Sequence, residues 1–185
     1  METRRSPRGE PQLSFCLVLG GASSGKSSFA ERLVERLGKR IAVIGTAIAS
    51  DAEMAARLEL HRRSRPADWL LFEGVADLAR AVPERAADAV LLESVDGLLA
   101  RTIDVDACLS AVLSLAATSP NLVAVSSEVG LSLVSPTPSG RAFTESLGSI
   151  NQRLSAVADE VYLVVAGLPL ELKGFARGRP GSALS

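Results

Sequence analysis

The sequence is poor in several residue types, and each shortage argues against a class of protein. Two cysteines in 185 residues are too few for a disulfide framework, and neither has partners at metal-site spacing. Aromatic residues make up 4% of the chain, which argues against a surface that stacks the bases of single-stranded nucleic acid. The formal net charge of −1 provides no overall field that would attract nucleic acid or an acidic membrane.

Long hydrophobic runs are also missing, and no run approaches the length of a membrane span. The basic start of the chain is followed by an apolar stretch, Phe15 to Leu19, that is too short for an export signal. We therefore expect a cytoplasmic protein with no membrane partner and no nucleic acid partner. The chain is 47% hydrophobic, which fits one α/β domain with buried strands.

The clearest motif follows that apolar stretch and fits the phosphate-binding pattern G-x-x-x-x-G-K-[ST], the P-loop. Glycines let backbone N–H groups point at an anion, and the next helix directs its N-terminus at the same phosphates. An ordinary glycine-rich turn is the alternative. The predicted nucleotide-binding residues of the motif are Gly20, Gly21, Ala22, Ser23, Ser24, Gly25, Lys26 and Ser27. Lys26 would reach the β- and γ-phosphates, and the Ser27 hydroxyl would hold Mg²⁺.

Short apolar runs alternate with helical patterns along the chain. Strands are predicted at 15–19, 41–45, 69–72, 89–92, 122–125, 161–165 and 168–172, and helices at 27–37, 51–64, 76–87, 107–117 and 141–158. This alternation predicts a P-loop (RecA-like) three-layer α/β sandwich with a mostly parallel sheet. The turn Ala166-Gly167 predicts an antiparallel edge strand at the C-terminal end. Residues 1–12 are predicted as a flexible arm, 13–173 as the nucleotide-binding catalytic domain, 174–185 as a flexible tail, and 130–140 as a mobile loop.

A P-loop site also needs an acidic group near Mg²⁺, usually at the end of a buried strand. Glu93 directly follows the apolar run 89–92, so Glu93 and Ser27 are the predicted metal ligands. Asp96 could replace Glu93 or act through water. Glu128, just past the strand 122–125, is a second acid at the same rim. The alternative for Glu93 is an exposed acid in a loop.

The single histidine of the chain lies on the predicted helix 51–64. Arg57, His61 and Arg65 are spaced at i, i+4 and i+8, so they share one stripe of that helix. The arginines would neutralise a polyphosphate while the imidazole attacked phosphorus. Spacing alone does not separate this role from that of a packed or surface histidine. The predicted catalytic residues are His61, Lys26, Arg57 and Glu93, and Arg65 and Glu73 complete the predicted nucleotide-binding residues.

Several blocks of the sequence resemble the adenosylcobinamide kinase/adenosylcobinamide-phosphate guanylyltransferase family. The matching positions run from Leu17 to Lys173 in family order. They comprise the P-loop, DAEMAAR at 51–57 with His61, Arg65-Pro66 and Trp69, EVG at 128–130, Asn151-Gln152, ADEV at 158–161 and VVAGLPL at 164–170. The blocks around His61 and Asn151 are far more specific than the P-loop.

The resemblance implies a bifunctional enzyme of cobalamin biosynthesis. Such an enzyme phosphorylates the aminopropanol hydroxyl of adenosylcobinamide and then attaches GMP from GTP to that phosphate. The guanylyl step passes through a histidine phosphoramidate, and the matching position is His61. The resemblance also implies Mg²⁺, GTP or ATP as phosphate donor, a corrinoid substrate and a homotrimer. A P-loop small-molecule kinase with a structural His61, and a non-catalytic nucleotide-binding paralogue, are the alternative interpretations.

The chain departs from the family pattern at the predicted rim of the site. The Thr and Trp that usually follow the Glu93 strand are absent from Ser94–Leu99, and Ser127 takes the place of an Asn. Leu131–Pro136 replaces a Gly-rich stretch, and Ser23 stands where an Arg is common. These changes bear on the kinase step and the identity of the substrate more than on GTP binding or on His61.

Overall fold

The computed structural model describes residues 14–47, 52–75, 77–131 and 133–176. The strands are β1 (Ser14–Gly20), β2 (Ile41–Gly45), β3 (Leu70–Glu73), β4 (Ala89–Glu93), β5 (Asn121–Ser127), β6 (Glu160–Val165) and β7 (Leu168–Glu171). The helices are α1 (Lys26–Leu37), α2 (Ala52–Ser64), α3 (Val95–Thr102), α4 (Val105–Thr118), α5 (Pro138–Val157) and α6 (Leu172–Ala176), with a 3₁₀ helix, η1 (Leu78–Arg80).

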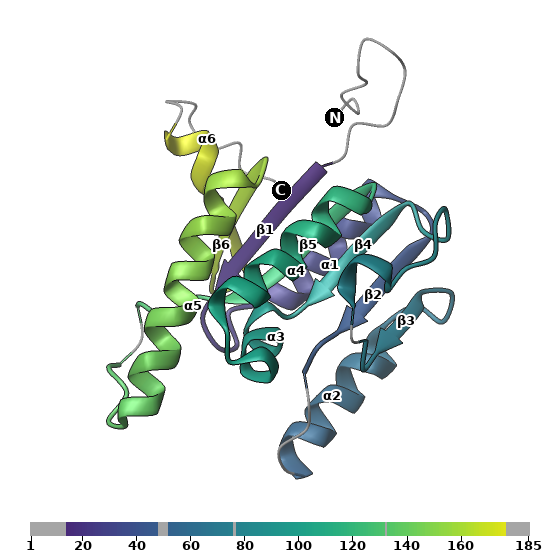
Figure 1. Ribbon diagram of the computed structural model, residues 1–185. Helices are drawn as coiled ribbons and strands as arrows, with labels where there is room; N and C mark the ends of the chain where they lie inside the picture. Colours follow the sequence, from purple (N-terminus) through teal and green to yellow (C-terminus); the bar gives the residue numbers. More distant parts are fainter. Residues whose placement is uncertain (1–13, 48–51, 76, 132, 177–185) are drawn as a thin grey trace.

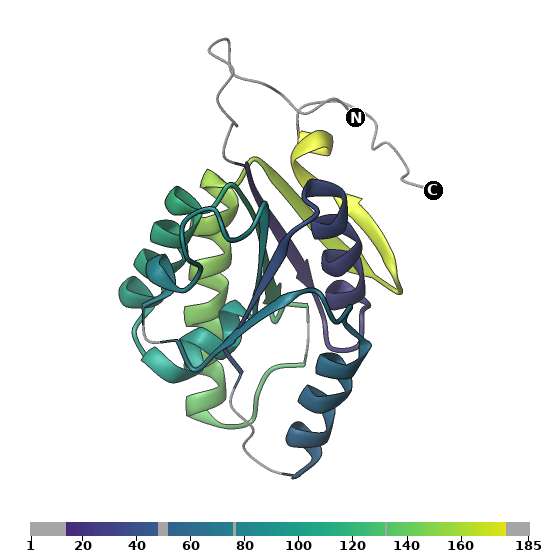
Figure 2. The same cartoon turned by 90° about the vertical axis from the view of Figure 1, so that its right-hand side faces the viewer.

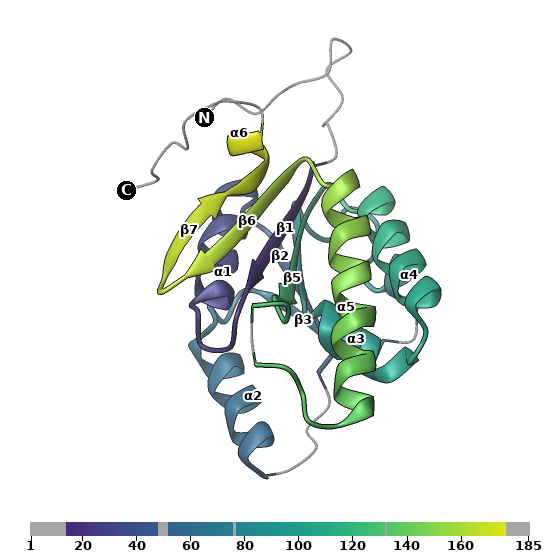
Figure 3. The ribbon, with the colours of Figure 1, turned by 90° about the vertical axis from the view of Figure 1, so that its left-hand side faces the viewer.

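The strands form one seven-stranded sheet in the order β3-β2-β4-β5-β1-β6-β7 (Figure 1). The paired strands are parallel except β6 and β7, which form the antiparallel pair at one edge. Figures 2 and 3 show α1 on one face of the sheet and α4 and α5 on the other. The predicted three-layer P-loop (RecA-like) α/β sandwich with an antiparallel C-terminal edge strand is therefore confirmed.

The core has two halves, one on each face of the sheet. On one face, α1 buries Phe29, Ala30, Leu33 and Val34 against the strands. On the other, apolar side chains of α3, α4 and α5 meet the opposite faces of the same strands. Because β1, β2, β4 and β5 are buried on both faces, they read as continuous apolar runs, which is why their positions could be predicted. In the described part of the chain, no helix combines the length and the apolar character needed to cross a bilayer.

The carboxyl ends of the parallel strands lie at one edge of the sheet, and α2 extends beyond that edge (Figures 1 and 3). The P-loop follows β1 at this edge, and Glu93 ends β4 there. In open α/β sheets, ligands bind outside the carboxyl ends of the strands. The fold therefore places the predicted site residues at the edge where such a ligand would bind.

Two predicted elements differ from the structure. The helix predicted at 76–87 is reduced to η1, because Pro83 removes a backbone donor and Arg85 has a left-handed φ of 62°. The strand predicted at 69–72 is β3; its apolar run suggests a buried strand, but it is an edge strand in which Leu70 is 41% and Leu71 38% exposed.

Two helices were not predicted. The hydroxyl of Ser94 accepts a hydrogen bond from the backbone N–H of Gly97 at 3.3 Å and caps α3. The short helix α6 extends to Ala176, into the segment predicted as a tail. Asp51, where the predicted helix 51–64 begins, lies outside the described residues, as do the arm 1–12 and the rest of the tail.

Candidate active site

The P-loop joins β1 to α1 as the motif predicts, and two of its positions require glycine. Gly25 has a φ of 87°, and a Cβ there would lie 3.2 Å from the Cα of Gly167. A Cβ on Gly20 would lie 2.9 Å from the carbonyl oxygen of Val164. The backbone N–H of Gly167 donates to the carbonyl of Ser24 at 2.8 Å. The β6–β7 turn therefore packs against the phosphate loop and supports it.

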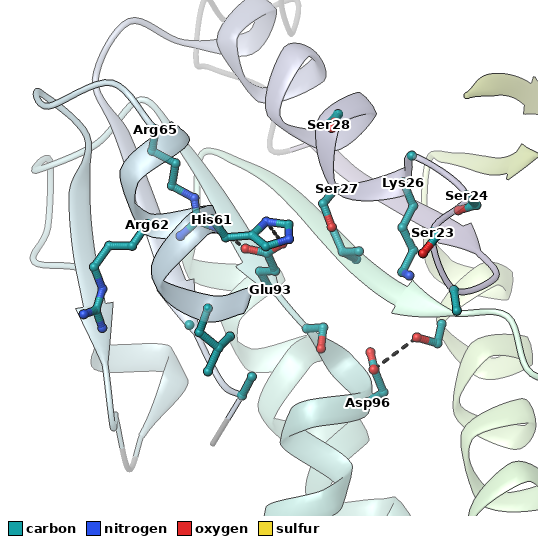
Figure 4. Close-up of a pocket in the computed structure, with 18 of the residues that line it drawn as sticks. Ser23, Ser24, Lys26, Ser27, Ser28, His61, Arg62, Arg65, Glu93 and Asp96 are labelled. Carbon is teal, nitrogen blue, oxygen red and sulfur yellow. Dashed lines mark hydrogen bonds and ion pairs between the residues drawn. The ribbon is translucent and has the colours of Figure 1, made fainter. Parts of the chain in front are cut away.

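Lys26 lies at the start of α1 and lines a cavity together with the Ser27 hydroxyl (Figure 4). Its Nζ donates to the carbonyl of Gly21 at 3.2 Å. Burial lowers the pKa of Lys26, and the negative charge of Asp96 opposes this shift. The ammonium is thus held inside the loop, where the motif predicts the phosphates of a nucleotide.

The cavity has a volume of about 580 Å³, which is in the range of sites for small molecules and cofactors. The P-loop forms one side, and the ends of β2, β4 and β5 form the floor. Leu58, His61 and Arg62 of α2, followed by Arg65, form another side. The predicted nucleophile and the predicted phosphate loop therefore line the same cavity (Figure 4).

Glu93 lies between His61 and Arg65. An Nη2 hydrogen of Arg65 bonds to Oε2 of Glu93, and Nε of Arg65 donates to Oε1 of Glu31 at 3.4 Å. The Nδ1 atom of His61 is 3.9 Å from Oε1 of Glu93. The Arg65 side chain is only 10% exposed, so this guanidinium is held by two carboxylates in a largely buried position. Glu93 is thus a partly buried acid with a cation on one oxygen and the imidazole near the other.

Asp96 lies three residues after Glu93, in the first turn of α3, and has different neighbours. The Ser127 hydroxyl donates to its Oδ2 at 3.1 Å. Its Oδ1 is buried and has no hydrogen-bond partner among the described residues. Ser127 and Asp96 belong to two segments that depart from the family pattern. The hydrogen bond between them therefore joins these two segments.

Of the remaining predicted acids, Glu73 lies in the cavity and Glu128 does not. Glu73 lines the cavity, and its Oε2 accepts a hydrogen bond from Nη2 of Arg62 at 2.5 Å. Arg57 lies in α2, but its side chain lies outside the described part of the chain. The Glu128 carboxylate accepts hydrogen bonds from the backbone N–H groups of Gly130 and Leu131, both at 2.9 Å. It therefore closes the loop after β5 and is not part of the cavity lining.

The sequence assigned no role in the site to Arg62 or to Ser127, although both line the cavity. Arg62 is adjacent to His61 but lies off the stripe used for the prediction. Ser127 ends β5 and is paired in register with Gly20 of β1. The family resemblance already placed Ser127 at the predicted rim of the site, but only the sheet order shows that it lies beside Gly20.

The fold and the cavity together define a P-loop nucleotide-binding protein. Two similar solved structures are the flagellar accessory protein FlaH from Methanocaldococcus jannaschii and an ATPase of a type III secretion system of pathogenic bacteria. The first has a TM-score of 0.50 and 16% identity and covers 89% of this chain and 80% of its own. The second has a TM-score of 0.50 and 9% identity, and the match covers 91% of this chain and 59% of that chain. These likenesses concern the fold alone.

The sequence model of one family, described as cobinamide kinase / cobinamide phosphate guanyltransferase (CobU), matches residues 16–172. The chain belongs to this family. The bifunctional adenosylcobalamin biosynthesis protein CobP of Pseudomonas aeruginosa is 35% identical over 167 residues, which cover 85% of this chain and 96% of that protein. The protein CobU of Salmonella typhimurium, with the same description, is 32% identical over 179 residues, covering 85% and 98%.

Proposed function

We propose that the chain phosphorylates adenosylcobinamide and then transfers GMP from GTP to the product, which gives adenosylcobinamide-GDP. The observation that carries the proposal is the single cavity that Lys26 and His61 share. The P-loop suits a polyphosphate, and the histidine provides a nucleophile for a second transfer. Membership of a family described by both activities supports the same pair of reactions.

In the guanylyl step, Nε2 of His61 would attack the α-phosphorus of GTP. An N–P bond forms, the bond from the α-phosphorus to the bridging oxygen breaks, and pyrophosphate leaves. A phosphate oxygen of the corrinoid then attacks the same phosphorus and releases the histidine. Glu93 faces Nδ1 at 3.9 Å, so it would hold the proton on that nitrogen and leave the lone pair on Nε2.

In the kinase step, the corrinoid hydroxyl would attack the γ-phosphorus of GTP or ATP. P-loop N–H groups and Lys26 would stabilise the charge on the transferred phosphoryl group. We assign Arg57, Arg65 and Glu73 to nucleotide binding, since two of them line the cavity and Arg57 is on the same helix as His61.

The oxygen atoms of Ser27 and Glu93 in the cavity lining fit Mg²⁺, which prefers oxygen ligands. Within the described ranges, no group of three His, Cys, Asp or Glu side chains could hold a metal. We therefore propose that Ser27 and Glu93 hold the ion together with nucleotide phosphates. When bound, Mg²⁺ would neutralise phosphate charge.

We further propose that the protein is a cytoplasmic homotrimer. The assembly is tested by light scattering on a size-exclusion column. A mass three times that of the chain supports the trimer, whereas the mass of one chain would contradict it.

The decisive experiment incubates the protein with GTP labelled at the α-phosphorus. Label on the protein that is acid-labile and alkali-stable, and absent from His61→Asn, supports the guanylyl-histidine. Label that enters only from the γ position would identify a small-molecule kinase instead. Tight GTP binding without turnover of adenosylcobinamide would identify a non-catalytic nucleotide-binding protein. Binding of GTP by the His61→Asn variant is the control for its fold.

A further inference from the structure

Three carboxylates line the cavity in the described part of the chain, and their partners differ. Glu73 is paired with Arg62 at 2.5 Å, and Glu93 is paired with Arg65. Asp96 forms no ion pair with a described residue, and its Oδ2 accepts a hydrogen bond from the neutral Ser127 hydroxyl. Asp96 is therefore the cavity acid whose charge no arginine neutralises in the described structure.

The position of Asp96 relates it to the phosphate loop. Its charge acts on Lys26 across the cavity, and Figure 4 shows its carboxylate below the Lys26 side chain. The Ser127 hydroxyl holds Oδ2 at 3.1 Å, which fixes the direction of the carboxylate. Oδ1 has no hydrogen-bond partner among the described residues, although it is buried. A buried polar atom without a partner is rare in native proteins, and a catalytic role is one of its established explanations.

We propose that Asp96 is the general base of the phosphoryl transfer step, an inference that rests on the proposed function. The acceptor oxygen forms a bond to the γ-phosphorus, and the bond from the γ-phosphorus to the β,γ-bridging oxygen breaks. The nucleoside diphosphate leaves with that oxygen. The proton of the acceptor hydroxyl passes to the carboxylate of Asp96, which lines the cavity and later returns the proton to solvent.

The alternative base, Glu93, is less suited to this step. Protonating a carboxylate that is bonded to a guanidinium weakens the ion pair, so the ionised form is favoured and its power as a base falls. The second oxygen of Glu93 faces His61. The two acids thus have different roles. Glu93 orients the histidine, and Asp96 accepts the proton of the hydroxyl that attacks the γ-phosphorus.

The test uses Asp96→Asn, which keeps the shape of the side chain and an oxygen that can accept from Ser127. We expect phosphorylation of adenosylcobinamide to slow by about 100-fold or more in kcat. The dissociation constant for Mg²⁺-GTP should stay within about 3-fold, and α-labelling of His61 should persist, because neither requires this base. The matched control is Asp106→Asn on α4, an exposed acid that pairs with Arg153 at 2.7 Å. The control should leave both half-reactions unchanged.

A second variant tests the role of the Ser127 hydroxyl, which orients the Asp96 carboxylate. Ser127→Ala keeps the carboxylate but removes the hydroxyl that orients it, so we expect a smaller loss in kcat, about 10-fold, with the same KM. Phosphorylation at the wild-type rate by Asp96→Asn would overturn the assignment.

The assignment would also be overturned if Asp96→Asn lost Mg²⁺-dependent GTP binding together with phosphorylation, because Asp96 would then hold the metal. If the wild-type protein phosphorylated no corrinoid and labelled no histidine, the proposed function would fail and the assignment of Asp96 with it.

Discussion

At the scale of single residues, Glu93 is the group on which the histidine half of the cavity depends. It is placed between Arg65 and His61. Glu93→Gln removes the charge that would hold the proton on Nδ1 and also one proposed Mg²⁺ ligand, so we expect labelling of His61 from α-labelled GTP, at saturating Mg²⁺-GTP, to slow by about 10- to 100-fold. The exposed acid Glu35 of α1, which is not part of the cavity lining, provides the control variant Glu35→Gln. Wild-type labelling by Glu93→Gln would show that Glu93 does not orient the imidazole.

The two cysteines give a second prediction at this scale. Burial, with a contribution from the Glu160 charge, raises the pKa of Cys16 from 9.0 to about 12. Burial also raises the pKa of Cys108, to about 11. We therefore expect neither thiol of the folded protein to react rapidly with dithionitrobenzoate at pH 8, and both to react in denaturant. One fast-reacting thiol in the folded protein would contradict the burial of both side chains.

The raised pKa of Cys16 also makes the free energy of unfolding depend on pH. Between about pH 9 and 12, the unfolded chain loses a thiol proton that folded Cys16 retains. The free energy of unfolding should therefore fall as pH rises through this window and show no Cys16 contribution to the slope below it. Cys16→Ala should have a shallower slope, measured by urea unfolding at several pH values. An unchanged slope would exclude the thiol as its source.

At the scale of elements, what could be predicted depended on how local its signal was. The strand, loop and helix around Lys26 each have a signal in adjacent residues. The hydrogen bond between Ser127 and Asp96 has none, because it depends on β5 lying between β4 and β1. That His61 shares a cavity with the P-loop was implied by the family resemblance, since helical spacing does not determine where α2 lies.

Besides its apolar contacts with the core, helix α5 is hydrogen-bonded to the sheet through the buried side chain of Asn151. Asn151, 9% exposed, accepts from the Ser126 hydroxyl at 2.7 Å and donates to the carbonyl of Ser127 at 3.0 Å. Asn151→Ala would leave the buried Ser126 hydroxyl without this hydrogen bond and would remove the bond to the Ser127 carbonyl, so we expect a loss of about 2 kcal/mol in the free energy of unfolding. The exposed neighbour in Gln152→Ala should change it by less than about 0.5 kcal/mol. If the two variants lowered the free energy of unfolding equally, the hydrogen bonds of Asn151 would not contribute to holding α5 on the sheet.

At the scale of the whole molecule, the cavity is built from segments that only the complete sheet brings together. The P-loop, α2 and the ends of β4 and β5 all contribute to it, and the strands between them share cores on both faces. A ligand in this cavity therefore contacts elements from much of the described chain. Binding should stabilise the fold as one unit, because the unfolded chain does not contain the site.

This coupling predicts how nucleotide changes thermal stability. With Mg²⁺-GTP at 100 times its dissociation constant, the native state gains about 2.7 kcal/mol. For a domain of this size we expect the midpoint to rise by about 5 to 10 °C in a single transition. Lys26→Ala removes the ammonium from the loop and should abolish most of the rise, whereas the exposed Lys39→Ala should retain it. Two separate transitions, of which GTP shifted only one, would contradict both this coupling and the single domain predicted at 13–173.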